Sequence, residues 1–192
     1  MKLSPTFVFT ILSLSLNFAA TAVAAVSCEL TEADRAANAN LSFDDFDQRG
    51  TTPTTSRKLG ERECYAEAAR ASEHYLLFGP LLDQHQRTVV TWHMGQHLAL
   101  NGDEETAARI LAATRRQPVN ADDTLDWNTY VIGTWAFLTK DRNLLRTASQ
   151  KLSSAPGVGN AMNARVLQGL EACFEKPYRD AYGTTACMPA KP

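Results

Sequence analysis

Residues 93–107 read HMGQHLALNGDEETA, and this stretch decides the fold. A helical pattern runs up to Leu100, the pair Asn101-Gly102 breaks it, and Asp103 opens a second helical pattern. Glycine tolerates the left-handed backbone that often ends a helix, and an aspartate before a helix accepts hydrogen bonds from the free amides of its first turn. The stretch therefore predicts two helices joined by a tight turn.

The same arrangement recurs twice further along the sequence. Gly95, Gly133 and Gly169 are separated by 38 and 36 residues. Each is followed by an apolar residue five positions on, then by a break and a second helical stretch: Leu100 and Asp103, Leu138 and Asp141, Phe174 and Pro177. A repeat of this length made of two short helices is typical of an α-helical hairpin array.

We therefore expect an all-α fold of six or seven helices, stacked as antiparallel hairpins within a domain at 61–192. The periodic segments place them at 61–78, 87–100, 103–116, 122–138, 141–152, 160–174 and 178–182. The preceding segment, 25–60, is rich in turn-forming residues and is predicted to be irregular. We expect it to pack on the array through Phe43 and Phe46.

Residues 87–118 resemble a tetratricopeptide repeat (TPR). That motif has a small residue, a glycine seven positions later and an alanine five positions after that, and Gly95, Gly102 and Ala107 stand at those steps. The resemblance implies a helical array with a concave face that binds a protein partner.

Two further segments resemble the repeat less closely. Residues 125–156 have Lys140 at the second glycine and Leu145 at the alanine, and residues 161–182 keep only the outline. The whole sequence is similar to small exported TPR-like proteins of bacteria.

The first 24 residues look like a secretory signal peptide. An apolar run follows Lys2 and is too short for a good membrane anchor, and Ala22-Val23-Ala24 is a small-x-small cleavage site. We expect cleavage after Ala24 and a periplasmic or secreted protein. A lipoprotein site at Cys28 is disfavoured, because lipidation would leave three cysteines.

The protein has four cysteines, Cys28, Cys64, Cys173 and Cys187. An even number in an exported protein predicts two disulfides, and four cysteines allow three pairings. The pairing Cys28–Cys64 with Cys173–Cys187 is favoured, because each cysteine then bonds its nearest neighbour in sequence.

Charge and motifs give no support to several functional classes. A formal net charge of −2 offers no basic footprint for nucleic acid, and no later segment is long and apolar enough to span a membrane. The sequence has no Gly-x-Ser-x-Gly motif, and Gly157-Val158-Gly159 is too weak a pattern for a phosphate loop. We expect a binding protein without catalytic activity or cofactor.

Six residues are candidates for contacting a protein partner: Trp92, His93, Gln96, Trp127, Asn128 and Tyr130. Several fall on the first helix of a hairpin in the TPR-like register, and aromatic side chains are enriched at binding hot spots. The alternative is that the aromatics fill the core and the amides satisfy buried polar groups.

Two other functions remain open. His93 and His97 share a helix face at a spacing that suits two metal ligands, so a metal-binding protein or metalloenzyme is possible if His74 converges with them. Met94 replaces the glutamate of the metalloprotease motif, and no metal site is expected. A periplasmic immunity or inhibitor protein is the other alternative, and a protruding Phe43–Phe46 loop would favour it.

Overall fold

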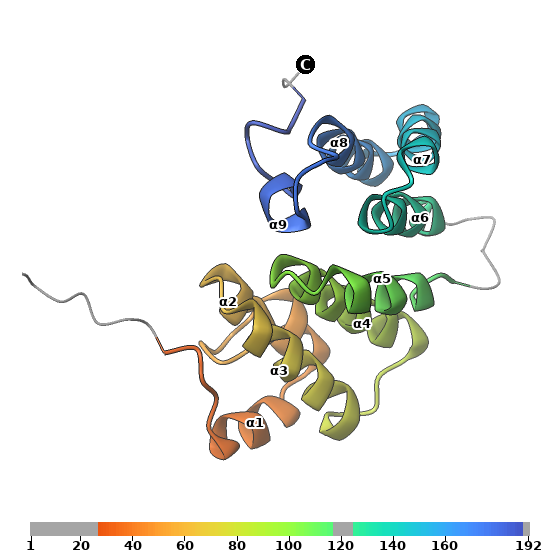
Figure 1. Cartoon of the computed structure of the whole chain (residues 1–192). Helices are drawn as coiled ribbons and strands as arrows, with labels where there is room; N and C mark the ends of the chain where they lie inside the picture. The colour runs from red at the N-terminus through yellow and green to blue at the C-terminus, as the bar shows by residue number, and fades with distance from the viewer. Residues whose placement is uncertain (1–26, 117–124, 190–192) are drawn as a thin grey trace, which may run out of the picture.

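The computed structural model describes residues 27–116 and 125–189, and the predicted signal peptide 1–24 lies outside them. Both stretches are helical and contain no strand, which confirms the all-α prediction (Figure 1). The elements are α1 (Glu32–Ala39), a π-helical turn η1 (Asp44–Gln48), α2 (Ser56–Glu61), α3 (Tyr65–Phe78), α4 (Gln84–Leu100), α5 (Glu104–Ala113), α6 (Trp127–Leu138), α7 (Arg142–Ser154), α8 (Val158–Ala172) and α9 (Tyr178–Ala181).

Helices α3 to α9 are the seven helices expected of the array. Each helix from α3 to α8 packs against the next one in sequence, and α6 also packs against α8 (Figure 1). Aspartates cap four of these helices, as the sequence suggested for two of them. Asp83, Asp103, Asp126 and Asp141 each accept a hydrogen bond from an amide in the first turn that follows.

Two of the repeating glycines allow the helices to approach closely. A Cβ on Gly95 would lie 2.5 Å from Cδ2 of Leu111 in α5, and a Cβ on Gly133 would lie 2.4 Å from Cδ1 of Leu167 in α8. Both leucines are fully buried and have no free space to move into. Gly95 and Gly133 therefore mark points of close helix contact, whereas the nearest atoms to a Cβ on Gly169 belong to Met188 and Cys187, after α9.

The turn of the first hairpin reappears in the second with a different residue. Gly102 has a φ of 94°, and Lys140, 38 positions on, has a φ of 60°. The ammonium group of Lys140 lies 3.5 Å from the carbonyl oxygen of Phe174 and 3.4 Å from that of Lys176. It also lies 4.4 Å from the ring centre of Phe137. These contacts offset a backbone conformation that costs an ordinary residue about 1 kcal/mol.

The segment before the array is not irregular, which corrects the prediction for 25–60. It forms α1, η1 and α2, and the hydroxyls of Thr31 and Thr55 cap α1 and α2. These elements are too short for apolar periodicity to reveal them. Phe46 is fully buried and stacks on Tyr75 of α3 at 3.9 Å between ring centroids, and Phe43 is half-buried against the same cluster.

The buried apolar residues form two clusters that meet along α4. The smaller cluster joins the N-terminal segment to α3 and includes Val90 of α4, whereas the larger one spans α4 to α9 and includes Trp92 and Ala99. Helix α4 thus belongs to both cores.

Both favoured disulfides are confirmed. Cys28 bonds Cys64, which ties the N-terminal segment to the start of α3, and Cys173 bonds Cys187, which ties the end of α8 to the segment after α9. Within the described parts of the protein, no helix has the length and apolar character needed to cross a bilayer.

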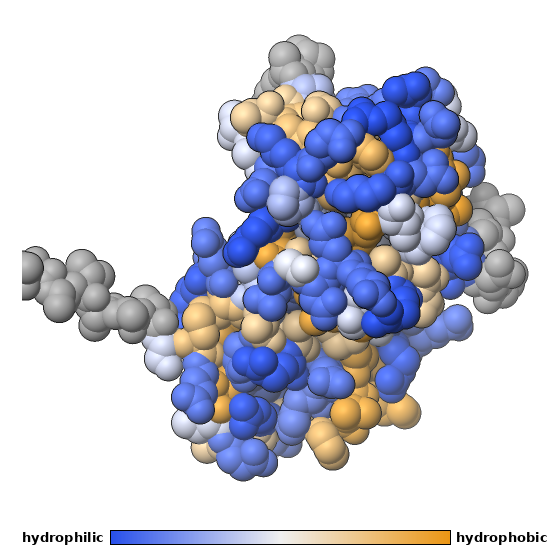
Figure 2. Space-filling model, viewed as in Figure 1, coloured by the Kyte–Doolittle hydropathy of each residue, from blue (hydrophilic) through white to orange (hydrophobic). Residues whose placement is uncertain are grey.

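Figure 2 shows a surface of mixed polarity with an apolar area at one end, over the end of α3 and the α3–α4 connection. Leu77, Phe78 and Leu81 are the exposed apolar side chains there, and Leu81 is 98 % exposed.

Candidate functional site

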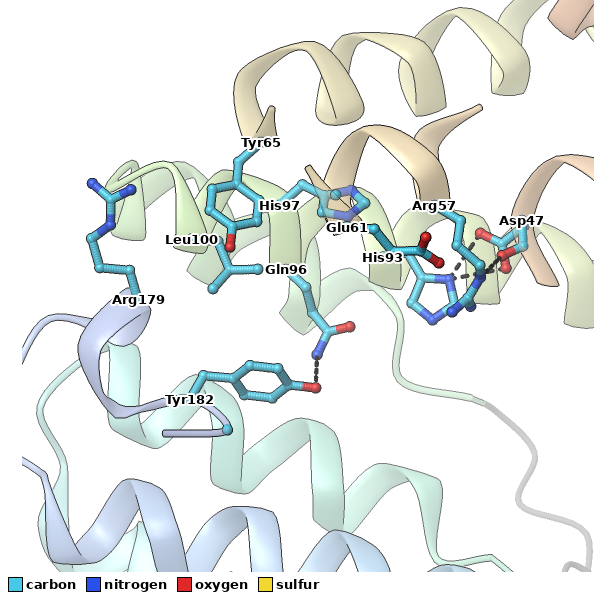
Figure 3. A pocket seen from close by; sticks show the side chains of 12 residues that line it. Asp47, Arg57, Glu61, Tyr65, His93, Gln96, His97, Leu100, Arg179 and Tyr182 are labelled. Carbon is cyan, nitrogen blue, oxygen red and sulfur yellow. Dashed lines mark hydrogen bonds and ion pairs between the residues drawn. The ribbon is translucent and has the colours of Figure 1, made fainter. Parts of the chain in front are cut away.

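A cavity of about 470 Å³ opens where the two cores meet, between α2, α4 and α9 (Figure 3). Its lining comes from segments far apart in the sequence: Asp47, Arg57, Gly60, Glu61, Tyr65, His93, Gln96, His97, Leu100, Arg179, Tyr182 and Gly183. The exposed residues among them, Glu61, Arg179 and Gly183, form its rim.

Helix α4 provides the floor of the cavity. Gln96 and His97 come three and four positions after His93, and Leu100 comes four and three positions after them, so the four side chains lie on one face of the helix. This face has two histidines and an amide where an ordinary core helix has apolar residues. The face is therefore unusually polar for one lying between two cores.

A buried aspartate orients His93. Nδ1 of His93 lies 2.8 Å and 3.0 Å from the two carboxylate oxygens of Asp47, whose side chain is 2 % exposed. An ionised carboxylate can only accept, so Nδ1 carries the proton and donates. Nε2 of His93 is therefore directed away from Asp47. The same carboxylate accepts a hydrogen bond of 2.5 Å from Nε2 of Gln48.

His97 belongs to a series of hydrogen bonds with two buried serines. The Ser72 hydroxyl donates to the carbonyl of Ala68, so the Ser56 hydroxyl donates to Ser72 at 2.7 Å. The remaining contact, 3.3 Å between Ser56 Oγ and His97 Nδ1, is then a donation from the imidazole. Nε2 of His97 is unprotonated in this tautomer.

Burial, and to a lesser degree the nearby His93 and Arg57, lower the pKa of His97 to about 4, against the opposing charge of Asp47. His97 is therefore neutral near pH 7. A base this weak does not activate Ser56, and Ser56 is itself buried.

A glycine lets α2 lie directly on His97. A Cβ on Gly60 would lie 2.6 Å from Nε2 of His97. Helix α2 thus covers this nitrogen and holds Arg57 and Glu61, one turn apart, against the cavity. His97 thus forms part of the cavity floor.

The opposite wall is α9 and the residues that follow it. Gln96 donates through Nε2 to the hydroxyls of Tyr182 at 3.1 Å and Tyr178 at 3.4 Å. The backbone amide of Tyr178 donates to the Glu104 carboxylate at 2.5 Å. These bonds join α9 to α4 and α5, and in Figure 3 the amide oxygen of Gln96 points towards the end of the cavity where Arg57 and His93 lie.

Arginines stand at the two ends of the cavity (Figure 3). Nε of Arg57 donates to the backbone oxygen of Asp47. Arg179 extends from α9 beside Tyr65. The pKa of Tyr65 is raised, chiefly by burial and also by the charge of Glu63, and the charge of Arg179 opposes this shift. The hydroxyl of Tyr65 is therefore a neutral donor near pH 7.

Of the six predicted contact residues, His93 and Gln96 line this cavity and the three aromatics do not. Trp92 is 3 % exposed and Tyr130 is 5 % exposed. Trp92 packs on Trp127 at 5.0 Å and on Tyr130 at 5.1 Å between ring centroids. Their burial in the larger core favours the alternative role in packing over partner binding.

Trp127 and Asn128 hold the end of the first hairpin. Nε1 of Trp127 donates to the carbonyl of Thr114, and the Asn128 amide both accepts from the backbone N–H of Arg116 and donates to its carbonyl. Both hydrogen bonds of the Asn128 amide go to backbone groups of Arg116. The Asn128 amide thus holds the backbone at Arg116.

The three histidines of the metal hypothesis do not converge. His74 packs on Phe78 at 4.7 Å between ring centroids on α3, away from the cavity that His93 and His97 line. Among residues 27–116 and 125–189, no group of three histidine, cysteine, aspartate or glutamate side chains is arranged to hold a metal ion.

Sequence reasoning missed most of the cavity. Asp47, Arg57, Tyr65, Arg179 and Tyr182 come from segments without a recognisable motif. Their shared signal is weak, because each is a single polar or amphipathic residue whose neighbours in the fold the sequence does not specify. The sequence singled out only His93, Gln96 and His97, on the face of α4.

Comparison with known proteins assigns no relationship: no protein-family model, no curated protein and no solved structure matches the sequence.

Proposed function

We propose that this protein is an exported protein-binding module with a TPR-like hairpin array and no catalytic activity, and that a segment of a protein partner docks in the α2–α4–α9 cavity. The observation that carries the proposal is the cavity itself, with His93 and Gln96 of α4 facing side chains from α2, α3 and α9.

The size and lining of the cavity suit part of a peptide. A volume of about 470 Å³ falls within the range of sites that bury a small ligand or a few side chains. Tyr65 and Tyr182 offer aromatic surface with a hydroxyl, and Gln96 offers an amide oxygen. Such groups recognise backbone and polar side chains, and Gln96 lies on α4, the helix that the resemblance to a TPR assigns to the concave face.

The hydrogen-bonding groups give little support to catalysis. Asp47 orients His93 as a carboxylate orients a general base. However, Ser56 is hydrogen-bonded to His97 and not to His93, so His93 has no serine to activate in this contact. All four cysteines are in disulfides. Two disulfides fit a periplasmic or extracellular location, which agrees with the proposed export.

A protruding Phe43–Phe46 loop would have favoured the immunity-protein alternative. Phe46 is instead buried against Tyr75. The cavity is the better-supported contact surface.

The proposal is tested by photo-crosslinking in the exported fraction of the source cells. A p-benzoylphenylalanine in place of Arg179, at the rim of the cavity, is expected to capture one protein at one-to-one stoichiometry. The same group in place of Gln150, which is exposed on α7, is the control and should capture none. Equal capture at both positions, or capture at neither, would overturn the proposal.

Affinity for the captured protein then locates the contact. His93→Ala and Gln96→Ala should each weaken binding about tenfold or more, the loss typical of a hot-spot residue. His74→Ala is the matched control, because His74 lies on α3 outside the cavity, and it should bind as the unmodified protein does. Thermal unfolding of each variant confirms that the fold is kept.

A further inference from the structure

We infer that the end of the cavity formed by Arg57 and His93 binds a carboxylate group of the partner, which rests on the proposed function. The carboxylate belongs to an acidic side group or to the C-terminus of a polypeptide, since both present the same pair of oxygens.

The two acidic residues of the cavity already have partners. Asp47 is buried and accepts from His93 and Gln48. Glu61 pairs with the ammonium of Lys58 at 2.7 Å. Neither carboxylate is thus available to neutralise an additional cation without losing an existing bond.

Unlike these two carboxylates, the guanidinium of Arg57 has terminal nitrogens without a charged partner among residues 27–116 and 125–189. Its Nε donates to the backbone oxygen of Asp47, and its two terminal nitrogens form no hydrogen bond or ion pair with any residue in the described parts of the protein. The side chain is half-buried, so these nitrogens are only partly hydrated. A fixed guanidinium with two free nitrogens matches the two oxygens of a carboxylate.

The hydrogen bond to the backbone oxygen of Asp47 also fixes the direction of the Arg57 guanidinium. Arg57 is held to Asp47, and Asp47 is held to His93, so the three residues form one connected unit at this end of the cavity. The Arg57 fork is therefore pre-organised, which lowers the entropy lost on binding. Figure 3 shows Arg57 and His93 side by side there, with Glu61 and the Gln96 amide facing them.

The neighbouring acids favour a carboxylate over a phosphate. Asp47 and Glu61 lie in the same cavity, and their repulsion increases with the charge of the bound anion. A singly charged group with two oxygens meets less repulsion than a phosphate carrying nearly two charges. Of these two anions, the carboxylate is therefore the one that the cavity favours.

The inference is tested by titrating three short peptides into the ¹⁵N-labelled protein at millimolar concentrations while following the Nε–H signal of Arg57. The peptides are acetyl-Gly-Glu-Gly-amide, its Gln analogue, and acetyl-Gly-Gly-Gly with a free C-terminus. The Glu peptide or the free C-terminus is expected to move the Arg57 signal and the Gln peptide to leave it unchanged, and the more effective of the two carboxylates identifies its source. Inorganic phosphate is the competing anion, and a larger response to it than to either carboxylate would overturn the inference.

Two variants separate the role of Arg57 from a general effect of charge. Arg57→Gln should weaken carboxylate binding about tenfold or more, since a hydrogen bond between charged groups is lost. Arg57→Lys should recover only part of it, because lysine keeps the charge without the fork. Arg179→Gln, at the opposite end of the cavity, is the matched control and should have a smaller effect.

The outcomes distinguish this inference from the proposed function. If the cross-linked partner binds Arg57→Gln as tightly as the unmodified protein, the carboxylate site is wrong and the binding module stands. If no partner is captured, the proposed function fails, and the peptide titration still decides whether Arg57 binds a carboxylate. A response to the Gln peptide as large as the response to the better of the two carboxylate peptides would also overturn the inference.

Discussion

At the scale of single residues, two ordinary side chains occupy left-handed backbone conformations with different consequences. Glu63, with a φ of 61°, is exposed in the turn before α3. Glu63→Gly should raise the free energy of unfolding by about 0.5–1 kcal/mol, because relief of about 1–2 kcal/mol of strain exceeds the added flexibility of the unfolded state. Urea unfolding with the disulfides intact measures this change.

Lys140 is the matched comparison for Glu63. It has nearly the same φ, but its ammonium group contacts two carbonyl oxygens and the ring of Phe137. Lys140→Gly relieves the same strain and removes these contacts, so it should not stabilise the protein. A gain equal to that of Glu63→Gly would show that the contacts of Lys140 contribute nothing.

His97 makes stability depend on pH. Its pKa of about 4 in the folded protein lies below the ordinary value of 6.5. The unfolded state therefore binds a proton more readily between these values, and stability is lost as pH falls from about 6.5 to about 4. The loss from this residue approaches about 3 kcal/mol at the low end.

Urea unfolding at pH 6.5 and pH 4 tests this dependence. His97→Gln should flatten the slope, because the glutamine cannot take up a proton. His74→Gln replaces a histidine outside the cavity and should keep the slope of the unmodified protein. If the two variants behave alike, acid destabilisation arises elsewhere.

At the scale of the helices, glycine has opposite effects at two sites. Gly133→Ala should destabilise the protein by about 1–3 kcal/mol, because its Cβ would overlap the buried Leu167 side chain. Gly159, in the first turn of α8, has its nearest atom at an ordinary 3.4 Å. Gly159→Ala should stabilise by about 0.5–1 kcal/mol through helix propensity. Thermal or urea unfolding of the two variants measures the difference. Destabilisation by both would contradict the expected gain at Gly159.

The helices of the array could be predicted because each carries a local signal. Apolar spacing marked the bodies of α3 to α8, and Asn101-Gly102 and Asp103 marked the first hairpin turn. The short elements α1, η1 and α2 had no such signal, since five to eight residues give too few turns for a periodicity. Thr31 and Thr55 cap two of them, yet threonine before a short polar stretch is equally typical of a loop.

At the scale of the whole molecule, the Cys173–Cys187 bond should control the α9 wall of the cavity. Replacing both cysteines by serine should lower the free energy of unfolding by about 3 kcal/mol, the chain-entropy estimate for a loop of this size. Amide hydrogen exchange around Tyr178 and Tyr182 should accelerate as α9 loosens. The matched Cys28→Ser and Cys64→Ser pair should destabilise the protein at least as much while leaving α9 protected, and faster exchange of α9 in both pairs would show that the bond has no local role.

The candidate site could be predicted only in part, because it is a property of the assembled molecule. His93 and Gln96 were recognisable as polar residues on a helix face, but Trp92 and Tyr130 on the same criteria proved to be buried. The local sequence does not distinguish a tryptophan in a core from one on a binding face, since packing between distant helices decides its exposure. Arg57 and Tyr182 reach the cavity only because α2 and α9 fold back onto α4.

The order in which the cavity is built follows from the origin of its walls. Ribosomes make α2 and α4 early, whereas α9 follows every other helix described here, and the cysteine that fastens it comes later still. The α2 and α4 sides of the cavity are therefore made before the α9 side. Closure of the α9 side requires both that α9 has been made and that Cys173 and Cys187 have been oxidised, so under reducing conditions this side should be held only by its hydrogen bonds and packing.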